Sequence, residues 1–426
     1  MLIASIFIAM LLMICINMPI AVALAMAGVL GLAATEGTSS LVTIALDMYD
    51  GSTKFSLIAI PMFVLAGAIM NAGGITDRLI NFVTAIIGFI RGGLAMVNIG
   101  VSLFFAEISG SAVADVAAMG SILIPQMKKR GYSKEFSAAV TSSSASLAII
   151  IPPSIPMILY AASANTSVEQ LFVAGVVPGL LGAAGLMTVA YFFAKKYNFP
   201  TEEAFNFTRL RETFIDALPA FTLPFIILGG IFGGYVTATE AAGLAVLASI
   251  IVSAWYGNLD VRHLRRAMLD GGIQTAVVML LVAASVLMGG FLTRAQIPQQ
   301  LAANILSITD QQWAILLILN FFFLVVGFFL HSAAAIILVI PIVIPLITAA
   351  GIDPVHFGLV VTLNLAIGQQ TPPVASVLVT ACSVARANIW KVSKVNIWFI
   401  GVLLAVLMLC TYVPSVPMFL VEYFYR

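Results

Sequence analysis

Two segments decide the fold: residues 142–154 read SSSASLAIIIPPS, and residues 362–374 read TLNLAIGQQTPPV. Each segment ends an apolar run with two adjacent prolines. Proline has no backbone N–H to donate and its ring clashes with the preceding turn, so a proline pair breaks a helix. The carbonyl groups expected to lose their helical partners are those of Ala148, Ile149, Gly368 and Gln369. At membrane depth such carbonyls are tolerated only where protein, water or an ion satisfies them.

An apolar stretch precedes each broken segment, at residues 94–128 and 312–350. Both stretches are too long for one span, which needs about 20 residues, and both have small or polar residues at their middle, SGS at Ser109–Ser111 and LHS at Leu330–Ser332. Basic residues, which favour the cytoplasmic side, flank both ends of the first stretch: Arg91, Lys128, Lys129, Arg130 and Lys134. We therefore predict two re-entrant helical hairpins. The segments 36–55 and 292–311, poor in basic residues, are predicted to be external.

The two halves of the chain carry prolines and glycines at matching positions. At an offset of 220 residues, the matching pairs are Pro125 with Pro345, Gly131 with Gly351, and Pro152–Pro153 with Pro372–Pro373. The charge pattern gives the two copies opposite orientations. The sequence therefore predicts an inverted-topology repeat, an architecture of secondary transporters, with residues 19–194 (hairpin 94–128) as one copy and 236–417 (hairpin 312–350) as the other.

Composition places the whole chain, residues 1–426, in a membrane as one transmembrane domain. Hydrophobic residues make up 62% and charged residues 9%, against about 45–50% and about 25% in soluble domains. We expect an all-α protein with about ten spans, near 2–16, 19–35, 56–72, 134–163, 170–194, 217–234, 236–256, 272–291, 354–381 and 394–417. Amphipathic stretches near 76–90, 205–216 and 296–308 are predicted to be interfacial arm helices.

Several functional classes are disfavoured. The net charge of +1 gives no electrostatic reason to bind nucleic acid. The sequence holds no Walker A, HExxH, GxSxG or CxxC motif, so neither ATP-driven transport nor a known hydrolytic centre is expected. We predict that the chain is not an enzyme. Glu240 opens a predicted span and is expected to take part in capping that helix with a nearby threonine.

The first hairpin carries an acidic residue that is a candidate cation ligand. Asp115 lies in an apolar run, where a carboxylate costs about 2.5–3.5 kcal/mol on insertion scales and needs a partner. Hard cations prefer oxygen ligands, so Ser109, Ser111, Asp115 and the freed carbonyls predict a Na⁺ site. The alternative is an aspartate that is protonated or hydrogen-bonded to neighbouring hydroxyls.

A second site is predicted at the other break. Its candidates are Gly327, Gly368, Gln370, Thr371 and the Val374 region, none of which is acidic. Only neutral dipoles would hold a cation there. The alternative is a kinked membrane helix with local side-chain bonding.

Three stretches together resemble the large membrane subunit of tripartite ATP-independent periplasmic (TRAP) transporters, within the ion transporter superfamily. They are SGSAVADVAAMGSILIPQM (109–127), GGIFGGYVTATEAAGLAVL (229–247) and AIGQQTPPVASVL (366–378). The resemblance implies a multi-pass protein of the bacterial inner membrane that imports carboxylates such as C4-dicarboxylates or sialic acid. It also implies a Na⁺ gradient, an elevator-like motion, a soluble periplasmic binding protein (P type) and a small four-helix membrane subunit (Q type). No four-span unit precedes residue 1, so we expect the small subunit as a separate chain.

The resemblance also implies two or more Na⁺ ions and assigns their ligands. The first set comprises Ser109, Ser111, Asp115, Ala148, Ile149 and Pro152. The second set comprises Gly327, Gly368, Thr371 and Val374. A carboxylate substrate is expected between the hairpin tips, at Ser111, Asp115, Ser332 and Gln370. Three alternatives stay open: a carrier of the same fold without a binding protein, an intramembrane enzyme acting on a lipid-linked substrate, and a passive channel.

Overall fold

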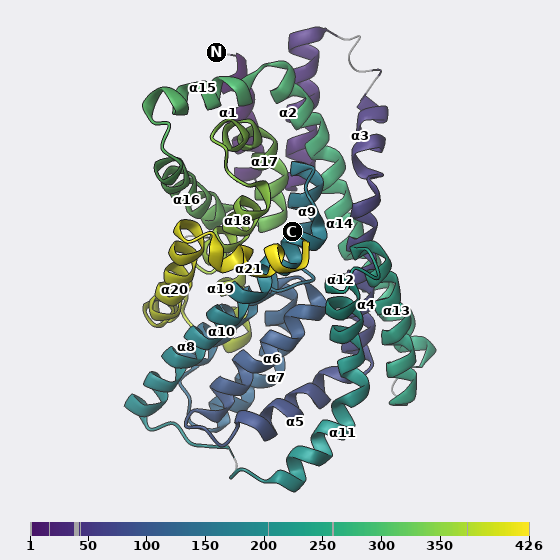
Figure 1. The fold of residues 1–426 in the computed structure, drawn as a ribbon, viewed down its shortest axis with the longest axis vertical. Helices are drawn as coiled ribbons and strands as arrows, with labels where there is room; N and C mark the ends of the chain where they lie inside the picture. The colour runs from purple at the N-terminus through teal and green to yellow at the C-terminus, as the bar shows by residue number, and fades with distance from the viewer. Residues whose placement is uncertain are drawn as a thin grey trace.

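The computed structural model describes residues 2–16, 18–37, 42, 44–202, 204–257, 260–372 and 374–425, and their side chains except at residues 2–4, 11, 15, 36, 107–109 and 263. Every regular element within these ranges is a helix, which confirms the all-α prediction (Figure 1). Eight of the described helices are long and apolar enough to cross a membrane. These eight include both legs of the second hairpin, whereas several of the ten predicted spans correspond to shorter apolar helices.

A peripheral group surrounds one side of the molecule. Its helices are α1 (Leu2–Cys15), α2 (Ile20–Glu36), α3 (Ile44–Ser52), η2 (Phe55–Ile58), α4 (Ala59–Ala72), α13 (Ala238–Trp255) and α14 (Val261–Arg294). Helix α14 packs against α2, α3 and α4, and α13 packs against α4. The helix α3 was not predicted from the sequence.

The first unit consists of a helical hairpin and a broken helix. Its elements are α6 (Gly93–Ser109), α7 (Ala112–Lys129), α8 (Lys134–Ala145), η3 (Ser146–Ile149) and α9 (Ile155–Ala164). The second unit repeats this order with α16 (Gln312–Phe329), α17 (Ser332–Ala349), α18 (Pro354–Gly368) and α19 (Ser376–Ala385). Both predicted helix breaks are therefore present. The matched glycines after the hairpins, Gly131 and Gly351, both adopt left-handed backbone with φ of 87° and 68°, a conformation that glycine reaches without strain.

Each hairpin returns to the side on which it starts. In the first, the Asn98 amide near the start of α6 lies 3.8 Å from the sulfur of Met127 near the end of α7. In the second, the Gln312 amide at the start of α16 donates to the carbonyls of Ala350 and Gly351, just beyond α17, at 2.9 and 3.3 Å. Tight pairing of the two ends makes each element a hairpin.

The two broken helices pack against each other in opposite directions. Helix α8 contacts α19, and α9 contacts α18, so the start of each broken helix lies beside the end of the other. The hairpins follow the same rule, since α7 contacts α8 and α19 whereas α17 contacts α18 and α9. Figure 1 shows α6 and α7 in the lower half of the molecule and α17 in the upper half.

The remaining helices connect or cover these units. They are α5 (Ile75–Ile87), α10 (Val168–Tyr197), α11 (Phe207–Pro224), η4 (Phe225–Gly229), α12 (Gly230–Phe232), α15 (Ile297–Ile308), α20 (Ile389–Tyr412) and α21 (Ser415–Tyr425). Two of the predicted arm helices appear as separate helices, α5 and α15. The third arm helix, predicted at 205–216, does not end at residue 216. Helix α11 continues from there directly into the next predicted span. A π-helical turn, η4, follows Pro224 there; prolines and π-turns are both common positions of helix kinks.

Two further boundaries differ from the sequence prediction. The span predicted at 394–417 ends at Tyr412, and a separate helix α21 begins after Pro414. The predicted cap of α13 is confirmed as a reciprocal capping box: the Thr237 hydroxyl accepts from the Glu240 N–H, and the Glu240 carboxylate accepts from the Thr237 N–H.

Candidate functional site

The first break lies in the interior of the molecule. Helix α8 ends at Ala145, one 3₁₀ turn follows, and no helix resumes until Ile155. The Ser154 hydroxyl donates to the carbonyl of Ile149 at 2.7 Å and also caps α9 by accepting from the Met157 N–H. The carbonyl of Ile149 thus lacks its helical N–H partner, as predicted, and a serine beyond the prolines replaces that donor. Within residues 44–202, no backbone N–H donates to the carbonyl of Ala148.

The tip of the first hairpin touches this break. Gly110 joins α6 to α7 with φ of 57°, and a Cβ added to it would lie 2.9 Å from the carbonyl oxygen of Pro153 and 3.2 Å from the nitrogen of Ile155. A larger residue would therefore push the tip away. Both α6 and α7 also contact η3, which carries Ala148 and Ile149.

The acid of the first site is fully buried at the start of α7. Asp115 is 0% exposed and its N–H donates to the carbonyl of Ser111, the N-terminal cap position of the helix. It is the only buried Asp or Glu among the side chains that the structure describes. The positive end of the α7 dipole favours a carboxylate there. Of the predicted ligands, the Ser109 side chain lies outside the described residues, and its backbone ends α6.

The second break is closed by its own backbone. The Thr371 N–H donates to the carbonyl of Gly368 at 2.9 Å, and the Val377 N–H donates across the break to the carbonyl of Gln369 at 3.0 Å. Both carbonyls thus lose the N–H groups that a continuous helix would provide, as predicted, and other backbone N–H groups replace them. Pro373 itself lies outside the described residues. A carbonyl oxygen has two lone pairs, so an oxygen that accepts one hydrogen bond can still coordinate a cation.

Two glycines bring the second hairpin against the second break. A Cβ on Gly368 would lie 2.6 Å from the Cα of Gly327, and a Cβ on Gly327 would lie 3.1 Å from the Cα of Gly368. The predicted pair is thus in direct backbone contact. Thr371 is half-buried, and its hydroxyl donates to the carbonyl of Ile367 at 2.8 Å. Val374 is 47% exposed and lies away from the core.

A buried polar network joins the two breaks. The Ser143 hydroxyl on α8 lies 2.7 Å from the Oε1 of Gln370 and 2.7 Å from the Oδ1 of Asn396 on α20. The Gln370 amide donates to the Ser146 hydroxyl at 3.2 Å, and the Asn396 amide donates to the Gln370 carbonyl at 3.1 Å. All four side chains are completely buried. Sequence reasoning missed this network, although the SSSAS run next to the first break was a signal for it.

The predicted substrate residues are only partly brought together. Ser111 and Asp115 share the tip of the first hairpin, and Ser332 opens α17 with 1% exposure. Gln370 lies inside the network, where its amide group already has partners on α8 and α20. Among the described residues, no hydrogen bond links Ser332 to the other three, and the substrate assignment stays a prediction.

The hairpins are attached to the broken helices by equivalent contacts. In the first unit, the Asn98 amide donates to the Thr141 hydroxyl at 2.7 Å and the Ser144 hydroxyl donates to the Asn98 Oδ1 at 3.0 Å. In the second unit, the Asn364 amide donates to the Oδ1 of Asn320 at 2.7 Å. Ser144 and Asn364 are 220 residues apart, the offset found in the sequence. The described residues contain no cluster of three or more His, Cys, Asp or Glu side chains suited to a metal.

Comparisons with known proteins agree over nearly the whole chain. Residues 7–416 match the profile of the family described as "Tripartite ATP-independent periplasmic transporter, DctM component". The chain is 38% identical over 406 residues to the isethionate TRAP transporter permease protein DctMQ of Oleidesulfovibrio alaskensis, covering 95% of this chain and 64% of that longer protein. It is 36% identical over 380 residues to the C4-dicarboxylate TRAP transporter large permease protein DctM of Pseudomonas aeruginosa, covering 89% of each.

A solved structure has the same fold. The Alcanivorax borkumensis YdaH transporter, described as having an unusual topology, matches with a TM-score of 0.66 and 13% sequence identity over 89% of each chain. At this identity the likeness concerns the fold alone. The relatives are transporter permeases rather than enzymes, and eight apolar helices make the chain a multi-pass protein of the inner membrane. The chain therefore belongs to the DctM component family of the tripartite ATP-independent periplasmic transporters, as its sequence motifs predicted.

Proposed function

We propose that this chain is the transport subunit of a Na⁺-coupled symporter that imports a small organic acid. The observation that carries the proposal is the buried assembly at the first break, where Asp115, the Gly110 tip and the 3₁₀ turn of Ala148 and Ile149 meet. A carboxylate, hydroxyls and backbone carbonyls are the ligand types that hard cations prefer. A bound Na⁺ would balance the charge of Asp115 in the membrane interior.

A second Na⁺ is proposed at the Gly327–Gly368 contact. The chain offers it only neutral ligands, from the backbone of these glycines, Thr371 and Val374. We propose that the weaker second site fills together with the first, because the Ser143–Gln370–Asn396 network fixes the two breaks relative to each other. Ordering of one break then lowers the cost of ordering the other, which is positive coupling without direct contact between the ions.

The two hairpin units are proposed to move as one block against the peripheral group, in an elevator motion. The units are inverted relative to each other, and transporters with inverted repeats commonly alternate access by moving one body around a fixed site. Mutual packing of α8 with α19 and of α9 with α18 supports a single moving body.

The substrate class is proposed from the relatives. One is named for isethionate and another for C4-dicarboxylates, and a sulfonate and a dicarboxylate are both small organic acids. We expect a carboxylate of the C4-dicarboxylate or sialic acid type. We also propose a Q-type four-helix membrane subunit and a P-type periplasmic binding protein as partners, since the family is tripartite. The runner-up is a carrier of the same fold that needs no binding protein.

Uptake in proteoliposomes tests the proposal. The chain with its small subunit would be reconstituted and presented with labelled organic acids, with Na⁺ or K⁺ outside and with or without the purified binding protein. We expect uptake only when an inward Na⁺ gradient and the binding protein are both present. Uptake that persists in K⁺ would refute Na⁺ coupling, and Na⁺-driven uptake without the binding protein would favour the runner-up.

A further inference from the structure

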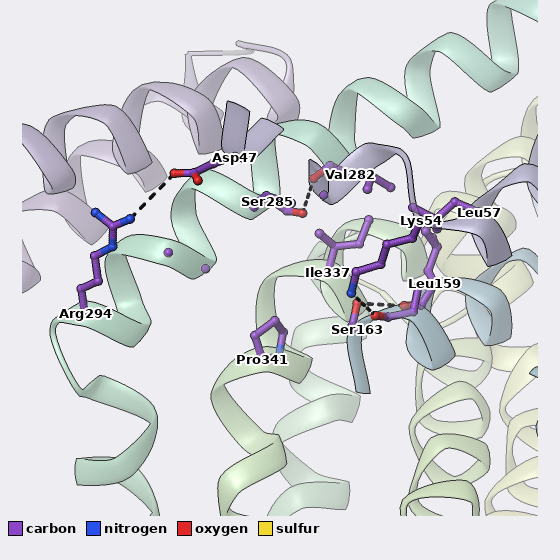
Figure 2. Close-up of a pocket in the computed structure, with 15 residues that line it drawn as sticks. Asp47, Lys54, Leu57, Leu159, Ser163, Val282, Ser285, Arg294, Ile337 and Pro341 are labelled. Carbon is purple, nitrogen blue, oxygen red and sulfur yellow. Dashed lines mark hydrogen bonds and ion pairs between the residues drawn. The ribbon is translucent and has the colours of Figure 1, made fainter. Parts of the chain in front are cut away.

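A cavity of about 330 Å³ lies apart from both breaks, where the peripheral group meets the hairpin units. Its walls come from α3, the segment before η2, α9, α14 and α17 (Figure 2). It therefore lies on the boundary that would slide in the proposed motion. Neither predicted Na⁺ site nor any predicted substrate residue contributes to it.

The charged side chains of this cavity favour an anion. Figure 2 shows Arg294 with Asp47 at one end and Lys54 at the other. Among the described lining residues two cations therefore face one carboxylate. Arg294 Nη2 lies 3.8 Å from Asp47 Oδ2. The Lys54 ammonium donates to the carbonyl of Ala162 at 2.7 Å, and an ammonium carries three donors.

The cavity has room between its charged ends. Gly289 and Gly290 of α14 line it, and a Cβ added to either would meet no atom within 4 Å. Leu57, Ile337 and Pro341 provide apolar surface. Binding sites for small molecules combine such apolar walls with a few polar groups that fix orientation.

We propose that this cavity is a vestibule that binds a small organic acid with carboxylates at both ends, one held by Lys54 and the other by Arg294. Both cations belong to segments predicted to be external by their low density of basic residues, so the vestibule faces the side of substrate entry. This inference rests on the proposed import of organic acids and adds a binding step before the hairpin tips. The same oxyanion chemistry could come from the phosphate of a lipid headgroup, which the experiment distinguishes.

Equilibrium binding tests the vestibule separately from transport. Radiolabelled succinate would be titrated against the purified full-length chain in detergent and in Na⁺-free buffer. The double variant Lys54→Gln, Arg294→Gln removes both charges at nearly constant side-chain size, and Gly290→Leu fills the cavity. Matched controls are Lys391→Gln, an exposed basic residue on α20, and Gly401→Leu, where an added Cβ meets no atom within 4 Å.

We expect the double variant and Gly290→Leu to weaken succinate binding at least about tenfold, while both controls bind like the wild type. Butyrate, which lacks the second carboxylate, should bind about tenfold more weakly than succinate. In the reconstituted transporter, the double variant should raise KM for uptake and leave kcat within about twofold.

Equal succinate binding by the wild type and the double variant would overturn the vestibule, and so would equal affinities for succinate and butyrate. Phospholipid that co-purifies with the wild type and is lost in the double variant would assign the cavity to a lipid headgroup instead. If Na⁺-driven uptake fails while the binding pattern holds, the proposed function falls and the anion site stands. If uptake is Na⁺-driven and binding is unaffected, only the vestibule is refuted.

Discussion

The two helix breaks share an architecture but differ in chemistry. At the first, the turn around Ala148 is completely buried and a buried carboxylate, Asp115, lies on the hairpin beside it. At the second, Thr371 is half-buried, Val374 is 47% exposed, and the predicted ligands are all neutral. The repeated fold thus preserves the interruption of the helix and not the charge. In the proposed function the first break would therefore dominate cation affinity, whereas the second would depend on close backbone packing.

The largest effect is expected for Asp115→Asn. This change removes the charge and keeps the shape of the side chain. Loss of one charged ligand removes about 3 kcal/mol of cation binding, equivalent to about a 100-fold loss of Na⁺ affinity. Uptake in proteoliposomes as a function of Na⁺ concentration measures the change.

Asp310→Asn is the matched control, because Asp310 is exposed at the start of the second hairpin. The control should transport like the wild type. Normal Na⁺ dependence in Asp115→Asn would remove the carboxylate from the mechanism and end the proposed difference between the two breaks.

A smaller effect is expected for Gly368→Ala at the second break. The new Cβ would meet the Cα of Gly327 at 2.6 Å, so α16 and α18 must separate. Such overpacking costs about 2–3 kcal/mol, measurable by unfolding in mixed detergent micelles and as lower uptake.

The control for this substitution is Gly401→Ala on α20, where the added Cβ has open space. Alanine is favoured over glycine within a helix by about 0.5–1 kcal/mol, so this variant should be as stable as the wild type or more so. If Gly368→Ala behaves like Gly401→Ala, close packing does not define the second break.

Coupling between the breaks is expected to be moderate. A double-mutant cycle with Ser143→Ala and Gln370→Ala isolates the contact between α8 and the second break. Residues in one hydrogen-bonded network typically couple by about 1–2 kcal/mol, read from the free energy of unfolding. Additive effects would mean that the two breaks are energetically independent, against the proposed joint filling.

The smallest effects on stability are expected at the equivalent hydrogen bonds that join each hairpin to its broken helix. Asn98→Ala removes the amide that donates to Thr141 on the first broken helix, and Asn320→Ala removes the Oδ1 that accepts from Asn364 on the second. Interhelical hydrogen bonds in membrane proteins contribute roughly 0.6–1.7 kcal/mol, so each variant should lose about 1 kcal/mol of unfolding free energy. A loss at only one of the two positions would show that the units are held together differently.

The sequence predicted the positions of the breaks better than their contacts. Proline pairs mark where N–H donors are missing, because that loss is a local property of the chain. They do not identify the replacement donor, and the actual donors are Ser154 at the first break and the backbone of Val377 at the second. These partners depend on how the chain folds back after each break.

Local sequence patterns could not predict contacts between segments that are far apart in the chain. Gln370 was predicted to contact substrate, yet its amide contacts Ser143 and Ser146, more than 220 residues away in the chain. Similarly, nothing local indicated that Lys54 and Arg294 line one cavity. The family resemblance predicted which residues would be Na⁺ ligands. Tertiary packing decides which of those residues already make hydrogen bonds within the protein.

Asp115 is the only buried acid among the described side chains, and this has an electrical consequence. In its ionised form it gives the empty core one negative charge, and an elementary charge crossing the membrane field gains or loses about 2.3 kcal/mol per 100 mV. An interior that is negative relative to the outside would push the unloaded core outward. Once a cation cancels that charge, the bias disappears, so the resting voltage itself would return the empty carrier to the face where loading begins.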